Sequence, residues 1–299
     1  MQLLNNKKCI FCQSNDIELK SAALAPFISA KIGSDSNEMF NLIHCKHCGC
    51  AFFDYRYDEN EVSKIYIGYR NEQYQKLRQK YESWYSKEIN NLIGDDIRAI
   101  ESRNKNLSEI LKNNIDIGNI RNVLDFGGDR GQYIPSILNN AKKYVYDISC
   151  KGVLPEIKLI KTIEECENNM PCGYDFIICA HVLEHLSYPE ETIKMIKSLM
   201  KNNGYLYIEL PFDSPFYKNP LDNVQYLFNK YFKLKDILKK YIEMKTTKHF
   251  LMHEHINYYT QKGLDCLMKR NGFVPICNKI CSVYSVIGIS KVICALYSL

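Results

Sequence analysis

The sequence predicts an α/β protein with a doubly wound, seven-stranded, mostly parallel sheet and a small amino-terminal module. Three observations lead to this prediction. From Asn119 onward, short apolar runs alternate with amphipathic helical segments, which is the pattern of parallel strands joined by helices. Two closely spaced cysteine pairs stand near the amino terminus. The 299 residues, 46% hydrophobic and 24% charged, suit about two globular domains.

The amino-terminal module, predicted over residues 1–58, carries the two cysteine pairs. Cys9 and Cys12 are separated by two residues, and so are Cys45 and Cys48, which a glycine follows. This spacing lets both thiolates of a pair reach one ion, and two such pairs complete a tetrahedral Cys₄ zinc site. We therefore predict a zinc-ribbon-like module in which these four thiolates bind a structural Zn²⁺.

Two further segments complete the predicted domain organisation. Residues 59–118 are polar with helical character and form a predicted helical connector or cap, and residues 119–299 form the main domain. Within that domain, residues 211–248 place apolar side chains at helical spacing among many lysines, which predicts a helical lid. We interpret its basic face as a solvated surface. Peripheral contact with an anionic membrane, or with a phosphate-bearing substrate, is the alternative.

Composition limits the compartment and the partners. The formal charge is +5 and the pI about 8.4, which favours an anionic small molecule such as a sugar nucleotide. No nucleic-acid partner is expected, because dedicated nucleic-acid-binding domains usually exceed a pI of about 9. The start resembles no signal peptide, and no run of about 18 apolar residues predicts a transmembrane segment. The 13 cysteines, with two metal-type pairs, indicate a reducing cytoplasm.

Seven apolar runs predict the strands of the main domain. In chain order they are 123–126, 144–147, 158–161, 174–179, 205–210, 272–277 and 283–289. The last two are too close for a crossover helix, so we expect them to form an antiparallel hairpin at one edge of the sheet.

The first of these strands ends in a glycine-rich turn that runs from Asp125 to Gly131 and contains three glycines. Glycines let the backbone turn sharply and let a ligand approach the amino terminus of the following helix. The second strand ends at Asp147, 22 residues after Asp125, where an acidic side chain can accept hydrogen bonds from a ribose diol. Together these features predict a site for a nucleoside-containing cofactor.

The same residues resemble the class I S-adenosylmethionine-dependent methyltransferases. Leu124–Gly131 matches the first motif of that family, and the segment from His181 to Leu186 resembles the one that lines the methionine end of the cofactor. An NAD-dependent dehydrogenase is the competing interpretation, and it has no role for the second segment. The resemblance implies S-adenosylmethionine as cofactor, with contacts from Asp125, Phe126, Gly127, Gly128, Gly131, Asp147, Ile148, Ala180 and His181.

The order of a Cys₄ module, a helical connector and this core resembles the sugar C-methyltransferases that act on nucleotide-linked keto sugars. His253, Glu254 and His255 match the His-Glu-His segment of those enzymes, and the resemblance implies catalytic roles for Glu254, His255 and His185. Those enzymes continue into a second large domain, whereas this chain ends shortly after the seventh predicted strand. A hydroxyl acceptor therefore becomes the favoured interpretation.

We accordingly predict a methyltransferase that acts on an oxygen of a sugar, nucleotide-linked sugar or glycan in surface polysaccharide biosynthesis. His255 is the expected general base, because an imidazole titrates near neutral pH. Glu254 is expected to orient His255, and His185 to position the acceptor.

Three alternatives stay open. One is C-methylation of a nucleotide-linked keto sugar. A second is an open divalent-metal site of His181, Glu184, His185 and His255, in which residues 181–185 are expected to begin a helix. It resembles the site of metal-dependent small-RNA 2′-O-methyltransferases. A third is a zinc-containing RNA-binding protein, whose binding would weaken steeply with salt.

Overall fold

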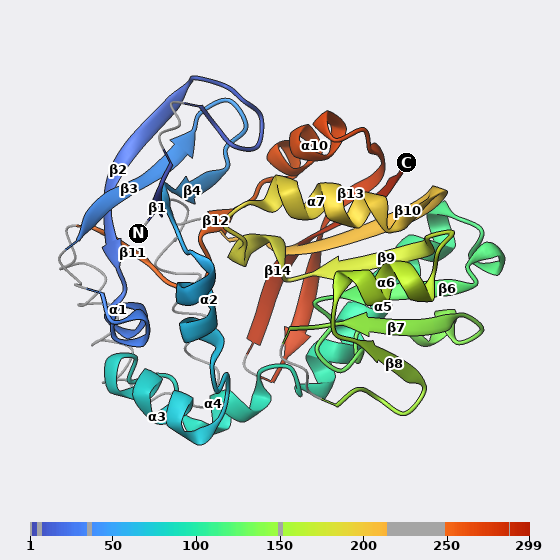
Figure 1. Cartoon of the computed structure of the whole chain (residues 1–299), viewed down its shortest axis with the longest axis horizontal. Helices are drawn as coiled ribbons and strands as arrows, with labels where there is room; N and C mark the ends of the chain where they lie inside the picture. Colours follow the sequence, from blue (N-terminus) through green and yellow to red (C-terminus); the bar gives the residue numbers. More distant parts are fainter. Residues whose placement is uncertain (1, 5–7, 35–37, 149–151, 214–248, 287) are drawn as a thin grey trace. The chain divides into compact units, whose positions relative to one another are not determined.

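The computed structural model describes residues 2–4, 8–34, 38–148, 152–213, 249–286 and 288–299 (Figure 1). The predicted lid, 211–248, lies outside the described residues from position 214 onward. The described chain forms two compact units. Unit 1 is drawn from Met1–Asp96, Asp213–Tyr258 and Ser285–Ile289, and unit 2 from Ile97–Phe212, Tyr259–Tyr284 and Ser290–Leu299. The division into a zinc-binding module (1–58), a helical connector or cap (59–118) and a main domain (119–299) stays a prediction.

Unit 1 is built on a five-stranded sheet in the order β11-β2-β3-β4-β12. The strands are β2 (Ile17–Leu24), β3 (Met39–Cys45), β4 (Ala51–Phe53), β11 (Phe250–Met252) and β12 (Asn257–Tyr258). Strands β2, β3 and β4 pair antiparallel in succession. Strand β11 adds parallel to β2, and β12 adds antiparallel to β4. The chain from 250 to 258 therefore supplies both edge strands of this sheet.

Four helices and a small second sheet complete the regular structure described in unit 1. The helices are α1 (Pro26–Ile32), α2 (Glu59–Tyr66), α3 (Glu72–Tyr81) and α4 (Lys87–Leu92), and the small sheet pairs β1 (Gln2–Leu3) with β5 (Tyr55–Arg56). Helix α2 begins with a capping box, in which the side chains of Asp58 and Glu61 each accept a hydrogen bond from the other's backbone N–H. Local sequence thus fixes where this helix starts.

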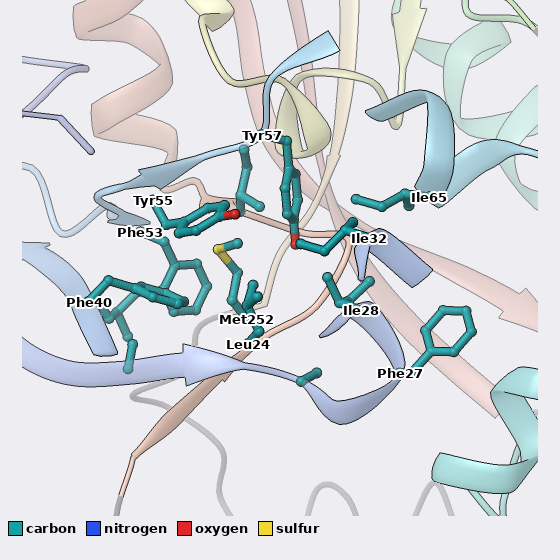
Figure 2. Packing of buried hydrophobic residues seen from close by; sticks show 14 of the residues in the cluster. Leu24, Phe27, Ile28, Ile32, Phe40, Phe53, Tyr55, Tyr57, Ile65 and Met252 are labelled. Atoms are coloured by element: carbon teal, nitrogen blue, oxygen red, sulfur yellow. The ribbon is translucent and has the colours of Figure 1, made fainter. Parts of the chain in front are cut away.

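The core of unit 1 joins the early strands and helices to the late segment. Figure 2 shows the side chain of Met252 among Leu24, Phe53 and Tyr55. Met252 and Ile256 are both fully buried in this unit. Because burial of a large apolar side chain contributes about 1.5–3 kcal/mol, these two residues anchor the segment between β11 and β12 to the sheet.

Unit 2 contains the predicted seven-stranded sheet, in the order β13-β14-β10-β9-β6-β7-β8. The strands are β6 (Asn122–Phe126), β7 (Lys142–Tyr146), β8 (Ile157–Ile160), β9 (Tyr174–Ala180), β10 (Met200–Pro211), β13 (Val274–Ser285) and β14 (Gly288–Ser298). Strands β8, β7, β6, β9 and β10 are parallel, and β14 is antiparallel to β10. The predicted fold class is confirmed.

Helices cover this sheet. They are α5 (Ile97–Asn114), α6 (Ile163–Asn169), α7 (Pro189–Ser198) and α10 (Gln261–Arg270), with a 3₁₀ turn η1 (Ile117–Asn119) before β6. Leu107 and Ile110 of α5 share a core with Phe176 and Ile178 of β9. Helices α7 and α10 lie side by side (Figure 1), joined where Arg270 donates to Glu190. No described helix is both long and apolar enough to cross a bilayer.

Three local predictions are corrected by the structure. The last two strands, predicted at 272–277 and 283–289, run over 274–285 and 288–298, because the buried tail continues to pair with β10. A 3₁₀ turn, η2 (Ser136–Leu138), lies between the glycine turn and β7 in place of the helix expected there. The residues after β9 likewise form a 3₁₀ turn, η3 (Leu183–His185), instead of the start of an α-helix.

Candidate functional site

The four cysteines singled out in unit 1 come together. The Sγ atoms of Cys9 and Cys48 are 3.7 Å apart, those of Cys12 and Cys45 are 3.5 Å apart, and all four lie within 4.8 Å of one another. A tetrahedral Zn²⁺ with bonds of about 2.3 Å separates its ligand sulfurs by about 3.8 Å. The four thiol groups therefore fit a single tetrahedral ion.

The two cysteine turns have the same backbone hydrogen bonds. The N–H four residues after the first cysteine donates to its carbonyl, from Gln13 to Cys9 and from Gly49 to Cys45. Both donors have positive φ, 63° and 78°. Strands β2 and β3 explain the long spacing between the turns, because their antiparallel pairing sets Cys45 opposite Ile17 at the start of β2.

The glycine turn of unit 2 lies at the carboxyl end of β6, as predicted. Gly127 and Gly131 have φ of 74° and 80°, which glycine adopts without steric cost. A Cβ on Gly128 would lie 2.3 Å from Cγ of Asp125, so only glycine leaves room there. The backbone N–H of Asp129 donates to Oδ2 of Asp147 at 2.9 Å, which ties the turn to the end of β7.

Asp125 is buried near the carboxyl end of β6, whose neighbours in the sheet are β9 and β7. Its Oδ2 atom has no hydrogen-bond partner within the described part of the chain. Burial raises the pKa of Asp125 to about 7; the positive charge of Arg103 opposes this shift, and the negative charges of Asp147 and Glu209 add to it. Such a buried acceptor is suited to a ligand that brings a hydroxyl or ammonium donor.

His181 follows β9 at the same edge of the sheet and has an unusual backbone conformation, with φ of 57°. Its Nδ1 lies 3.2 Å from Oε1 of Glu184, and its Nε2 lies 3.1 Å from Oε1 of Glu209. Burial and Arg103 lower the pKa of His181, but the two carboxylates outweigh them and raise it above its ordinary value. The two carboxylates therefore favour the protonated form of the imidazole, in which both nitrogens are donors.

Arg103 and Glu209 were missed by the sequence analysis. Nε of Arg103, on α5, donates to Oε1 of Glu209 at 2.5 Å, and the Tyr207 hydroxyl donates to Oε2 at 2.9 Å. Burial raises the pKa of Glu209, yet Arg103, His181 and Tyr207 bring it to about 2. Glu209 interrupts an apolar strand, which is the signal that could have drawn attention to it.

The remaining predicted cofactor residues also lie at this edge. Phe126 is the last residue of β6 and is buried, and Ala180 is the last residue of β9 and is partly buried. Ile148 lies two residues beyond β7 with 67% of its surface exposed. The structure thus gathers all nine predicted residues at the carboxyl ends of three neighbouring strands, β7, β6 and β9.

Comparison with known families decides the class of protein. The family described as "Methyltransferase domain" matches residues 70–278, more than two thirds of the chain. The chain belongs to this family. It is an S-adenosylmethionine-dependent methyltransferase. The site fits the cofactor, because Oδ2 of buried Asp125 has no hydrogen-bond partner among the described residues and the glycines of the adjoining turn let a ligand approach the backbone. No curated protein matches the sequence.

Solved methyltransferases resemble the chain at low sequence identity. The 1,6-didemethyltoxoflavin-N1-methyltransferase of Burkholderia thailandensis is 13% identical with a TM-score of 0.48, and the match covers 88% of this chain and 96% of that one. The magnesium protoporphyrin IX methyltransferase of Synechocystis is 14% identical with a TM-score of 0.47, covering 79% and 99%. Both structures contain S-adenosylhomocysteine.

The three predicted catalytic residues of the methyltransferase fall in different units. Glu254 and His255 lie in unit 1, between β11 and β12, whereas His185 ends η3 in unit 2. In unit 2, Nε2 of His185 lies 3.9 Å from Oε1 of Glu184. The catalytic-metal alternative also takes residues from both units and stays a prediction.

In unit 1, Glu254 belongs to a buried polar network. Its Oε1 accepts hydrogen bonds from the Tyr74 hydroxyl at 2.5 Å and from Nη1 of Arg78 at 3.0 Å, both on α3. Arg78 also donates to Glu82, which pairs with Nδ1 of His253 at 3.2 Å. Helix α3 and its C-cap residue, Glu82, therefore hold two successive residues of the His-Glu-His segment.

His255 is more accessible than its neighbour Glu254. About a third of its side chain is exposed, compared with 12% for Glu254. Its Nδ1 lies 3.7 Å from Oδ2 of Asp213, which is longer than a hydrogen bond but close enough for charge attraction. A carboxylate on this side favours a proton on Nδ1 and therefore a lone pair on Nε2.

Proposed function

We propose that this methyltransferase methylates a hydroxyl of a sugar, nucleotide-linked sugar or glycan in surface polysaccharide biosynthesis, with His255 as general base. The observation that carries the proposal is the construction of the His-Glu-His segment in unit 1. Buried Met252 and Ile256 flank it, and Glu254 is fixed by Tyr74 and Arg78. His255 is left partly exposed with a carboxylate on its Nδ1 side.

S-adenosylmethionine, when bound, supplies a methyl group on a positively charged sulfur. The new bond joins the acceptor oxygen to that methyl carbon, and the electron pair of the broken carbon–sulfur bond stays on sulfur. In the proposal His255 accepts the hydroxyl proton on Nε2 as the oxygen attacks. Asp213 stabilises the resulting imidazolium, and His185 positions the acceptor.

We also propose that Zn²⁺ is bound by Cys9, Cys12, Cys45 and Cys48 as a structural ion. Four thiolates fill all four positions of a tetrahedral ion, so the site has no place for substrate. The matching backbone geometry of the two cysteine turns supports this role.

Product analysis tests the acceptor. The protein is incubated with S-adenosylmethionine and nucleotide-linked sugars, and products heavier by one methyl group are sought by mass spectrometry. His255→Ala should lower turnover by about 10²–10⁴-fold, the usual contribution of a general base. Cofactor affinity, measured by calorimetry, should stay unchanged.

His253→Ala is the matched control, since His253 is also a partly exposed histidine of this segment. Carbon-13 NMR of the labelled product separates O-methylation from C-methylation. A methyl group on carbon would overturn the hydroxyl acceptor in favour of the keto-sugar alternative. Near-normal turnover of His255→Ala would remove His255 as the base.

A further inference from the structure

A row of alternating basic and acidic side chains, here called the charge chain, runs along the carboxyl edge of the sheet in unit 2. Arg103 contacts Glu209, Glu209 contacts His181, and His181 contacts Glu184. The carboxylates at positions 184 and 209 each have only 2% of their side chain exposed. Each of these buried carboxylates thus lies against at least one basic side chain.

Stability alone does not explain this arrangement. Buried ion pairs lose hydration that their attraction only partly repays, and apolar residues of similar size are often as stable or more so. The backbone at His181 also has a positive φ, which is unfavourable for a residue with a side chain. Glu209 holds His181 at two points, since its backbone carbonyl accepts from the His181 N–H at 2.8 Å.

The charge chain is connected to the glycine turn on two sides. Next to His181, the Val182 side chain packs so closely on Gly127 that a Cβ there would lie 2.5 Å from Cγ2 of Val182. On the other side, the Arg103 guanidinium lies 3.6 Å from the ring centre of Tyr133, two residues after Gly131. A displaced Arg103 side chain would therefore release contacts on both sides of the glycine turn.

We propose that Arg103 is a positioning residue for S-adenosylmethionine binding, which orients His181 through Glu209 and the end of the glycine turn through Tyr133. Arginine suits this role because its planar group pairs with a carboxylate along one edge and stacks on an aromatic ring with its face. The proposal depends on the methyltransferase activity and is independent of the acceptor.

Three variants separate positioning from stability. Arg103→Met leaves Glu209 buried without its main cation. The double variant Arg103→Met/Glu209→Gln removes both charges, which by the same reasoning restores much of the lost stability. Arg103→Lys keeps the positive charge but loses planar stacking on Tyr133. Arg98→Met, at an exposed position of the same helix, is the matched control.

Affinity for S-adenosylmethionine is measured by calorimetry and stability by thermal unfolding of the cofactor-free full chain. We expect Arg103→Met to weaken binding at least about tenfold. The double variant should recover melting temperature while its binding stays at least about tenfold weaker. Arg103→Lys should bind with intermediate affinity, and Arg98→Met should match the wild type.

Two results would overturn the proposal. One is a double variant whose affinity returns to the wild-type value together with its stability, because a purely structural role makes the two change in parallel. The other is a folded Arg103→Met protein with unchanged affinity. If Arg103→Met does not fold, the double and lysine variants still decide the question.

Discussion

The cysteine cluster of unit 1 and the charged edge of unit 2 are assembled in different ways. Each pair of the cluster comes from one short turn, and the two turns repeat the same hydrogen bonds. The charged edge takes Arg103 from α5, His181 from the bend after β9 and Glu209 from β10, which are distant in sequence. A site made of repeated local turns is readable from residue spacing, whereas a site made of long-range pairs is not.

Removal of one cysteine should have the largest effect and tests the local half of this comparison. Cys45→Ser should reduce zinc from one ion per chain to nearly none and unfold much of unit 1. Structural zinc supplies about 10–16 kcal/mol to small peptide sites, so little can compensate for its loss. Metal analysis and hydrogen exchange measure the two outcomes.

Cys172→Ser is the control, because Cys172 is an exposed cysteine of unit 2. If wild-type protein prepared without chelator holds no zinc, the proposal of a zinc site in unit 1 is wrong. The cysteine cluster of unit 1 would then, like the charged edge of unit 2, be held together by side-chain contacts without a metal ion.

The pH dependence of stability tests the buried charge in unit 2. The pKa of Asp125 is raised from 3.8 to about 7 in the folded chain, so the folded state binds the proton more tightly than the unfolded state. This contribution is fully present below about pH 4 and is lost as pH rises through about 7. It amounts to at most about 4 kcal/mol, since one pKa unit corresponds to about 1.4 kcal/mol.

Urea unfolding of cofactor-free protein between pH 4 and 8 should therefore show a decline that Asp125→Asn makes shallower. The asparagine is similar in size but has no carboxyl proton to lose. An identical decline in both proteins would show that Asp125 is not the titrating group.

The smallest expected effect concerns the space beside Asp125. Gly128→Ala places a Cβ 2.3 Å from Cγ of Asp125, so the turn must shift. Overpacking of this kind costs about 1–3 kcal/mol, which corresponds to roughly a 5–150-fold loss of S-adenosylmethionine affinity if the turn bears it. Calorimetry measures the loss.

Gly152→Ala is the matched control, because a Cβ there meets no atom within 4 Å. Equal affinity of the two alanine variants would contradict the close packing of the glycine turn. It would also weaken the contrast between the two sites, since the turn would then be set by local conformation alone.

The sequence by itself determined the features that depend on spacing. Alternating apolar runs predicted the strands of unit 2, because strand and helix periodicities differ within a few residues. The two-residue gaps within the cysteine pairs predicted the cluster, and the position of Asp147 after Asp125 predicted its place at the end of β7. These signals are local, so tertiary packing did not change them.

Tertiary structure alone decided which charged residues meet. Arg103 and Glu209 are 106 positions apart, and Tyr74 and Glu254 are 180 apart, with no pattern in the sequence that links them. Folding also placed the His-Glu-His segment in unit 1 and put a 3₁₀ turn where a helix was expected after the glycine turn. The physical reason is that a buried charge needs a partner wherever folding leaves it, and the folded chain, not the residue spacing, determines which partner lies within reach.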